Sequence, residues 1–194
     1  MLQLGYKGAL IAPLRRLVVK VGSAVLSDPN GLRPDVIADL ARQIDAIMRD
    51  GREVVLVTSG AIAAGRARLG RRASTIAERQ AAAATGQIEL MRQWAKAFDA
   101  YGRTIAQILL THQDLAERKR RLNAIHTIES LFAAGAIPVV NENDTVAVEE
   151  IRMGDNDVLS SLVAGMVQAG LLVTLFLCAL QFPFAEPAAV PEAG

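Results

Sequence analysis

The sequence has few of the residues that several common protein classes require. Its 194 residues include one cysteine, Cys178, so no disulfide can form within the chain. Aromatic residues make up 4%, which leaves few stacking surfaces for single-stranded nucleic acid. The net charge is only +1, so no global field attracts nucleic acid or anionic membrane. The lone cysteine suits a reducing compartment, and we expect a cytoplasmic protein that binds no nucleic acid.

Two common types of ligand-binding signature are also missing. No Gly-Lys-Ser/Thr triplet follows a glycine-rich loop and no Gly-x-Gly-x-x-Gly motif follows a strand-like run, which disfavours a P-loop and a dinucleotide fold. His112 and His126 belong to no metal-ligand pattern, and we expect no metal centre made of protein side chains. Residues 1–14 lack a convincing targeting pattern and are expected to form a disordered or loosely packed extension.

Two segments keep other functions open. Residues 158–185 contain no charged side chain and are long enough to span a bilayer. Serine and glutamine side chains interrupt this stretch, and Gly170 divides it into a helix-like and a strand-like part, so we favour no membrane segment. The basic run 118–121 lies on a predicted helix, and we interpret it as a solvated face rather than a nucleic-acid patch.

Strand-like and helix-like periods alternate along the chain. Apolar, β-branched runs predict strands at 17–21, 54–57, 104–110 and 136–140. Apolar residues at three- and four-residue steps, with capping residues at their ends, predict helices at 34–50, 61–69, 75–101, 114–135 and 156–169. This order predicts an α/β fold with a mostly parallel sheet and helices on both faces.

Some local features are expected within these elements. Asp114 is expected to cap the helix that ends near Gly135, and residues 145–151 are expected to form a hairpin. Trp94 is expected in the core. The inner face of the helix at 75–101 is expected to consist of Ile88, Met91, Ala95 and Phe98.

Polar side chains gather after the last predicted strand. Asn141–Asp144 follows the apolar run 136–140, and Gly154–Asp157 precedes the final helix. Together the two clusters hold four carboxylates and three carboxamides within seventeen residues. Asn and Asp favour turns, so two solvated loops are the simpler interpretation. We favour a binding site, because open α/β sheets bind ligands at the carboxyl ends of their strands.

Two further loops lie at the same predicted edge of the sheet. Lys20 and Gly22 end the first strand, where a lysine can contact phosphate and a glycine lets the backbone approach closely. Ser59 and Gly60 lie between the second strand and a helix, where backbone N–H groups favour an anionic oxygen. The alternatives are a solvated lysine beside a turn and a simple serine N-cap.

Five segments resemble the amino acid kinase family, in its glutamate 5-kinase branch. They occur in the family's order over about residues 15–173, at 17–23, 57–65, 107–111, 138–144 and 154–157. The resemblance implies a three-layer α/β/α sandwich. It also implies ATP-dependent phosphorylation of the L-glutamate γ-carboxylate to glutamyl 5-phosphate, the first step of proline biosynthesis. Mg²⁺ would accompany ATP, and members of this branch are expected to form homo-oligomers.

The resemblance assigns roles at the phosphate end of the site. Lys20 matches the lysine that stabilises the transferring phosphoryl group, and Asp157 matches the residue that orients catalytic lysines. Gly22 and Gly60 match positions where backbone amides reach phosphate oxygens. Phosphoryl transfer depends on positioning and charge neutralisation, which fits these residue types.

The glutamate end is assigned in the same way. Ser59 matches a substrate-contacting serine, and Asp144 and Asn156 match the residues that hold glutamate. A carboxylate suits the α-ammonium of an amino acid, while a carboxamide can donate to a carboxylate. We therefore expect Ser59, Asp144 and Asn156 to bind substrate.

The sequence departs from the family after Val173. The family continues into a nucleotide-binding segment and a second lysine, whereas residues 174–194 form a divergent apolar and Pro/Ala-rich tail. We therefore expect a chain that lacks the C-terminal half of the fold, with little activity of its own. Two other functions stay open: an amino acid kinase acting on N-acetylglutamate or aspartate, and a non-catalytic fragment that binds a ligand or a partner subunit.

Overall fold

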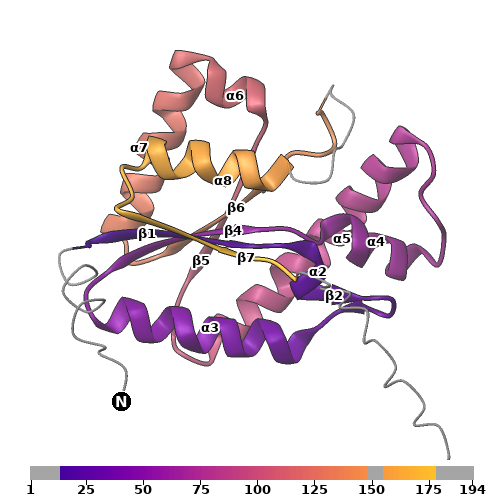
Figure 1. The fold of residues 1–194 in the computed structure, drawn as a ribbon, viewed down its shortest axis with the longest axis horizontal. Coiled ribbons are helices and arrows are strands. Elements are labelled where there is room, and N and C mark those ends of the chain that lie inside the picture. Colours follow the sequence, from indigo (N-terminus) through magenta and orange to yellow (C-terminus); the bar gives the residue numbers. More distant parts are fainter. Residues whose placement is uncertain (1–13, 148–154, 178–194) are drawn as a thin grey trace, which may run out of the picture.

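The protein contains one five-stranded parallel sheet between two layers of helices (Figure 1). The computed structural model describes residues 14–147 and 155–177. The sheet has the strand order β5-β6-β4-β1-β7, and each neighbouring pair of strands is parallel. This architecture confirms the predicted α/β/α sandwich.

The predicted strands and helices all have counterparts in the structure, whereas the short elements at 23–28 and 31–32 were not predicted. The sheet strands are β1 (Arg16–Val21), β4 (Glu53–Thr58), β5 (Ile105–Leu110), β6 (Ile137–Glu142) and β7 (Leu171–Leu175). A small antiparallel pair consists of β2 (Ser27–Asp28) and β3 (Gly31–Leu32). The helices are α2 (Ser23–Leu26), α3 (Pro34–Arg49), α4 (Ala61–Leu69), α5 (Ile76–Asp99), α6 (His112–Ala116), α7 (Arg118–Ala133) and α8 (Asp155–Met166).

Each strand sends alternate side chains into two separate cores, because successive residues of a strand point to opposite faces. In β4, Val54 and Leu56 join the core beneath α3 and α5, while Val55 and Val57 join the core beneath α7 and α8. All four of these side chains are buried. A parallel sheet covered on both faces needs such continuous apolar runs, which is why they predicted strands correctly.

Trp94 belongs to the first of these cores and is fully buried, as predicted. Its indole Nε1 donates a hydrogen bond to Thr58 Oγ1 at 3.0 Å, so the core tryptophan also fixes the last residue of β4.

Three local predictions were wrong or are only partly covered by the structure. Ile88 was predicted to lie on the inner face of α5 but is 75% exposed. The buried face of the first half of this helix consists instead of Ala82, Ala83 and Gly86, whose small size lets α4 pack closely. Asp114 does not cap its helix; Thr111 is the N-cap, and Asp114 is the third residue of a capping box. The helix then breaks at Glu117 into α6 and α7. Residues 144–146 form a turn rather than a strand, and the rest of the expected hairpin lies outside the described residues.

The uncharged stretch that begins at residue 158 is divided between two elements. Its first part lies in α8 and its next part forms β7, which pairs with β1. Across the described ranges, no helix is long and apolar enough to cross a membrane. The extension expected before residue 14 lies outside the described residues.

Helices α4 and α5 pack with their backbones almost in contact. A Cβ built on Gly65 would lie 1.8 Å from the Ala82 carbonyl oxygen, and one built on Gly86 would lie 1.8 Å from that of Ala61. Only glycine fits at both positions. This packing fixes the first turn of α4 and therefore the Ser59–Gly60 loop at the end of β4.

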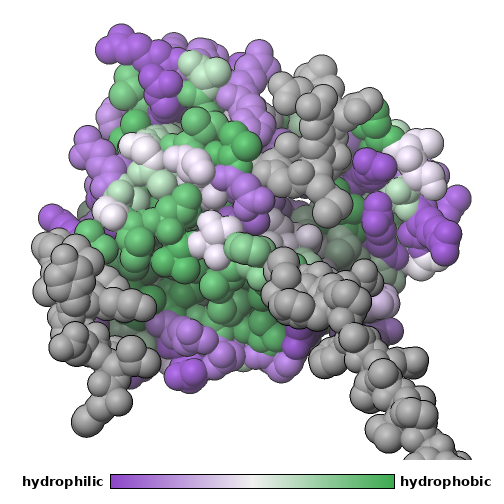
Figure 2. All heavy atoms as spheres, in the orientation of Figure 1, coloured by the Kyte–Doolittle hydropathy of each residue, from purple (hydrophilic) through white to green (hydrophobic). Residues whose placement is uncertain are grey.

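Strand β7 forms one edge of the sheet. Figure 2 shows apolar side chains gathered between α8 and α3, over β7. Phe176 and Leu177, which follow the strand, are exposed. This face is the most apolar surface in that view.

Candidate active site

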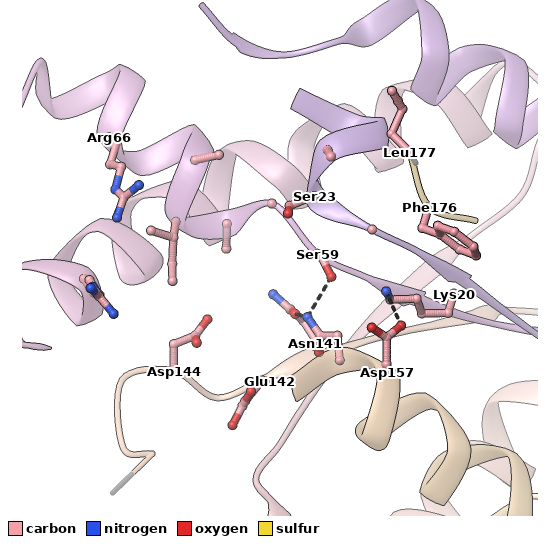
Figure 3. Close-up of a pocket in the computed structure, with 18 residues that line it drawn as sticks. Lys20, Ser23, Ser59, Arg66, Asn141, Glu142, Asp144, Asp157, Phe176 and Leu177 are labelled. Atoms are coloured by element: carbon pink, nitrogen blue, oxygen red, sulfur yellow. Dashed lines mark hydrogen bonds and ion pairs between the residues drawn. The ribbon is translucent and has the colours of Figure 1, made fainter. Parts of the chain in front are cut away.

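A cavity of about 570 Å³ lies at the carboxyl ends of the parallel strands. The residues predicted to form a site all line it: Lys20, Gly22, Ser59, Gly60, Asp144, Asn156 and Asp157. They come from the ends of β1 and β4, the loop after β6 and the start of α8 (Figure 3). The tertiary structure thus brings all seven residues to one place.

Lys20 and Asp157 form an ion pair inside the cavity. Lys20 is only 5% exposed, although its ammonium group is a charged group that usually stays in water. Asp157, in the first turn of α8, keeps 53% of its side chain exposed. The alternative of a solvated lysine is therefore wrong. The buried ammonium has a fixed position from which it can meet an anionic group.

Gly22 contributes space beside this ammonium group. A Cβ at Gly22 would lie 3.2 Å from the Leu175 carbonyl oxygen and 3.6 Å from Lys20 Nζ. The Gly22 N–H donates to that same Leu175 oxygen at 2.9 Å. This amide is thus occupied by the sheet, which differs from its expected contact with phosphate.

Ser59 and Gly60 form the turn from β4 into α4. Gly60 is the N-cap and has a positive φ of 103°, a conformation that favours glycine. Ser59 makes no capping hydrogen bond and instead faces Asn156, so the alternative of a simple serine N-cap is wrong. The first turn of α4 lines the cavity, and its positive dipole end favours an anion there.

A chain of side-chain amides connects the strand ends. Asn156 Nδ2 donates to Ser59 Oγ at 2.8 Å and to Asn141 Oδ1 at 3.1 Å. Asn141 Nδ2 donates in turn to Gln87 Oε1 of α5 at 2.8 Å. Asn141 is only 2% exposed, so this cluster is not a solvated loop. The network orients Asn156 and Ser59 toward each other.

Two polar atoms of this network have no hydrogen-bond partner among the described residues. They are Asn156 Oδ1 and Gln87 Nε2, and both are buried. A buried polar atom without a partner is costly, which is typical of a site that a ligand or water completes.

Asp144 lies in the turn that follows β6. The backbone of this turn is held by Asn143 N–H, which donates to the Leu110 carbonyl oxygen at 3.0 Å. Thr145 Oγ1 donates to Asn143 Oδ1 at 2.6 Å and closes the turn. Asp144 and Glu142 thereby place two carboxylates on the wall of the cavity.

Sequence reasoning missed several lining or supporting residues. Gln87 and Arg79 lie on a helix with no motif around them, and Arg66 follows the recognised α4 segment. One signal existed: Arg79, Ala83 and Gln87 follow a four-residue step and therefore share a helix face. Arg79 and Gln87, at the two ends of this face, are polar, and Ala83 between them is small. This pattern indicates a helix face that contacts polar groups of the protein or of a ligand.

The carboxylates of the cavity suit a magnesium ion only if phosphate oxygens of a bound ligand supply its other ligands. Across residues 14–147 and 155–177, no three His, Cys, Asp or Glu side chains form a group able to hold a metal. Asp157 is paired with Lys20, and Glu142 and Asp144 lie on another wall. Mg²⁺ usually binds through one or two carboxylates plus substrate phosphates. The donor set therefore suits Mg²⁺ carried by a nucleotide.

The chain matches a known family of proteins. The model of the amino acid kinase family matches residues 15–176, and the chain belongs to this family. Among its relatives is a glutamate 5-kinase of Thermus thermophilus, which is 56% identical over 163 residues. The glutamate 5-kinase of Syntrophotalea carbinolica is 52% identical over 168 residues.

The matched regions cover 83% and 86% of this chain, respectively. They cover 44% and 45% of the two relatives. The chain therefore spans slightly less than half the length of the curated relatives that it matches.

Proposed function

We propose that this chain forms the amino-acid-binding and phosphoryl-accepting part of a glutamate 5-kinase. The reaction is transfer of the γ-phosphoryl group of ATP to the γ-carboxylate of L-glutamate, the first step of proline biosynthesis. The observation that carries the proposal is the convergence of Lys20, Ser59 and Asn156 with Asp144 on one cavity at the strand ends. The names of the relatives support the same substrate.

The chemistry follows from the charges in the cavity. An oxygen of the γ-carboxylate forms a bond to the γ-phosphorus, the bond from that phosphorus to the bridging oxygen breaks, and ADP leaves. Lys20 would neutralise negative charge on the transferring group, and Asp157 would keep the ammonium oriented. When bound with ATP, Mg²⁺ would neutralise further charge on the phosphates.

The remaining side chains would hold the amino acid. Asp144 is proposed to bind the α-ammonium group, because a carboxylate is the natural partner of an ammonium. Ser59, whose Oγ accepts from Asn156 Nδ2 at 2.8 Å, is proposed to bind a carboxylate of the substrate through its own hydroxyl hydrogen. A positive ligand group would also satisfy the unpartnered Asn156 Oδ1. We further propose a cytoplasmic homo-oligomer, as is expected of this branch.

Binding of the amino acid tests the proposal directly. Isothermal calorimetry of the purified chain should detect L-glutamate and should detect N-acetylglutamate and L-aspartate much more weakly. Asp144→Asn should weaken glutamate binding roughly tenfold or more, because it removes one charge-assisted contact. Asp50→Asn is a matched control, because Asp50 pairs with Arg52 on the exposed surface. Unchanged binding in Asp144→Asn, or tighter binding of N-acetylglutamate or aspartate, would contradict the assignment.

Formation of the acyl phosphate tests the proposed phosphoryl transfer. We expect little acyl phosphate from the 194-residue chain, because among its described residues only Lys20 offers a cation at the phosphoryl position. Fusing the corresponding C-terminal part of the Thermus thermophilus relative after Val173 should give glutamate-dependent product. The measurement is hydroxylamine trapping together with ADP release. A fusion that folds and binds glutamate but makes no product would count against the kinase assignment.

A further inference from the structure

The cavity contains two more cations at a distance from Lys20. Arg66 of α4 and Arg79 of α5 both line it. Figure 3 shows Arg66 on the side of the cavity opposite Lys20, with Asp144 and Glu142 on the wall between them. The site therefore has a positive end at Lys20, carboxylates along one wall and a second positive end at the arginines.

The position of Arg79 is fixed by the path of α5. Gln87 lies two turns further on the same helix face and bonds to Asn141 at the end of β6. Gln80, the residue after Arg79, donates from Nε2 to the Ala147 carbonyl oxygen at 3.3 Å. The first half of α5 thus runs along the turn that carries Asp144, which brings Arg79 to the wall of the same cavity.

Neither arginine has a carboxylate partner within the described parts of the chain. Arg66 donates only to the Ala73 carbonyl oxygen, at 3.2 Å. Arg79 Nε is buried and has no hydrogen-bond partner there. Most other arginines of the described structure pair with an acid, as Arg16 does with Glu53 and Glu129. A buried guanidinium nitrogen without a partner, on a cavity wall, is suited to an anionic ligand.

We infer that Arg79, supported by Arg66, binds the α-carboxylate of the amino-acid substrate and selects for ligands whose α-carboxylate is free. The inference rests on the proposed function. L-glutamate carries its γ-carboxylate at one end and, at the other end, an ammonium and a carboxylate on the same carbon. The cavity offers Lys20 to the γ-carboxylate end, and Asp144 together with the two arginines to the ammonium and the α-carboxylate. A guanidinium can hold a carboxylate through two parallel hydrogen bonds, which fixes the ligand's orientation as well as its charge.

A pair of ligands isolates this contact. L-isoglutamine keeps the γ-carboxylate and the α-ammonium of glutamate but has a neutral carboxamide in place of the α-carboxylate. Calorimetry should show that the unaltered chain prefers L-glutamate over L-isoglutamine by roughly 10- to 100-fold, the size of one charge-assisted contact. In Arg79→Gln the preference should fall to about threefold or less, with isoglutamine affinity nearly unchanged. Arg79→Lys should retain part of the preference.

Controls separate loss of the contact from loss of the fold. Arg72→Gln removes an exposed arginine near the start of α5 that does not line the cavity, and it should keep the full preference. Retained isoglutamine binding in Arg79→Gln shows that the site is still folded. If Arg79→Gln keeps the preference for glutamate, or the unaltered chain has none, the inference is wrong while the proposed function stands. If the unaltered chain binds neither ligand, the glutamate assignment fails and the inference fails with it.

Discussion

The carbonyl oxygen of Ala61 occupies the place where a side chain on Gly86 would begin, since a Cβ built there would lie 1.8 Å away. Ala61 is the first residue of α4 and directly follows Gly60. The contact therefore ties the turn from β4 into α4, which lines the cavity, to α5, the helix that also carries Gln87 and Arg79. The packing of the two helices and the geometry of the cavity therefore both require glycine, which has no side chain, at position 86.

Gly86→Ala should strongly destabilise the protein. The new methyl group would have to displace backbone atoms, so we expect a loss of about 3 kcal/mol in the free energy of unfolding. Gly165→Ala is the matched control: this glycine also lies in a helix, and a Cβ there meets nothing within 4 Å. It should be neutral or stabilising by up to about 1 kcal/mol. Urea denaturation of both variants checks the contrast, and equal effects would contradict the close helix contact.

Asp157→Asn should destabilise the chain more than Lys20→Met does. Removing Asp157 leaves a buried ammonium without its carboxylate, whereas Lys20→Met removes the buried charge and keeps an apolar stem. Because Asp157 is half exposed, water offsets part of the loss, and we expect about 1–2 kcal/mol for Asp157→Asn. The measurement is chemical denaturation at neutral pH. A more stable Asp157→Asn than Lys20→Met would show that the ion pair contributes little.

The capping box at the end of β5 should make stability depend on acid pH. Burial acts to raise the pKa of Asp114, but hydrogen bonds from Thr111 and Arg120 outweigh it and place the pKa below its usual range. A lowered folded-state pKa stabilises the protein above the unfolded value of about 3.9, and this contribution is lost as the pH falls through the folded pKa.

Asp114→Asn should therefore cost about 1 kcal/mol at neutral pH and progressively less below about pH 4. Unfolding free energies measured across this range give the difference between the two proteins. Thr111→Ala provides a second test, because it removes the hydroxyl that both accepts from Asp114 N–H and donates to Asp114 Oδ2. A penalty for Asp114→Asn that does not change with pH would contradict the proposed origin of the shift.

The apolar edge at β7 should cause self-association of the purified 194-residue chain. Strand β7 pairs with β1 on one side only among the described strands, and an apolar strand edge is a template for further pairing. We expect concentration-dependent oligomers by light scattering and binding of a hydrophobic dye. Thr174→Lys, at an exposed position of this strand, should reduce both, while Thr145→Lys in the turn after β6 should not. A monodisperse chain without dye binding would contradict the prediction.

Local sequence patterns predicted the sheet strands well but not every helix detail. Strand β4 is identifiable from four successive apolar residues, because a strand buried on both faces needs no alternation. The face of α5 was assigned incorrectly at Ile88, because the buried stripe depends on how closely α4 approaches. That approach is decided by Gly65 and Gly86, whose role is visible only when both helices are in place.

The sequence by itself determined the strands, their order along the chain and the residue types of the site, because β-branched runs, helical periods and polar clusters are local properties. Only the tertiary structure decided which of these residues meet. Asn156 reaches Ser59 and Asn141 because β6 and β4 are neighbours in the sheet and α8 begins at their carboxyl ends. The packing of α5 against α4 also brought Arg79 to the cavity that holds Lys20. The spacing of Lys20 and Arg79 in the sequence does not predict that they line the same cavity.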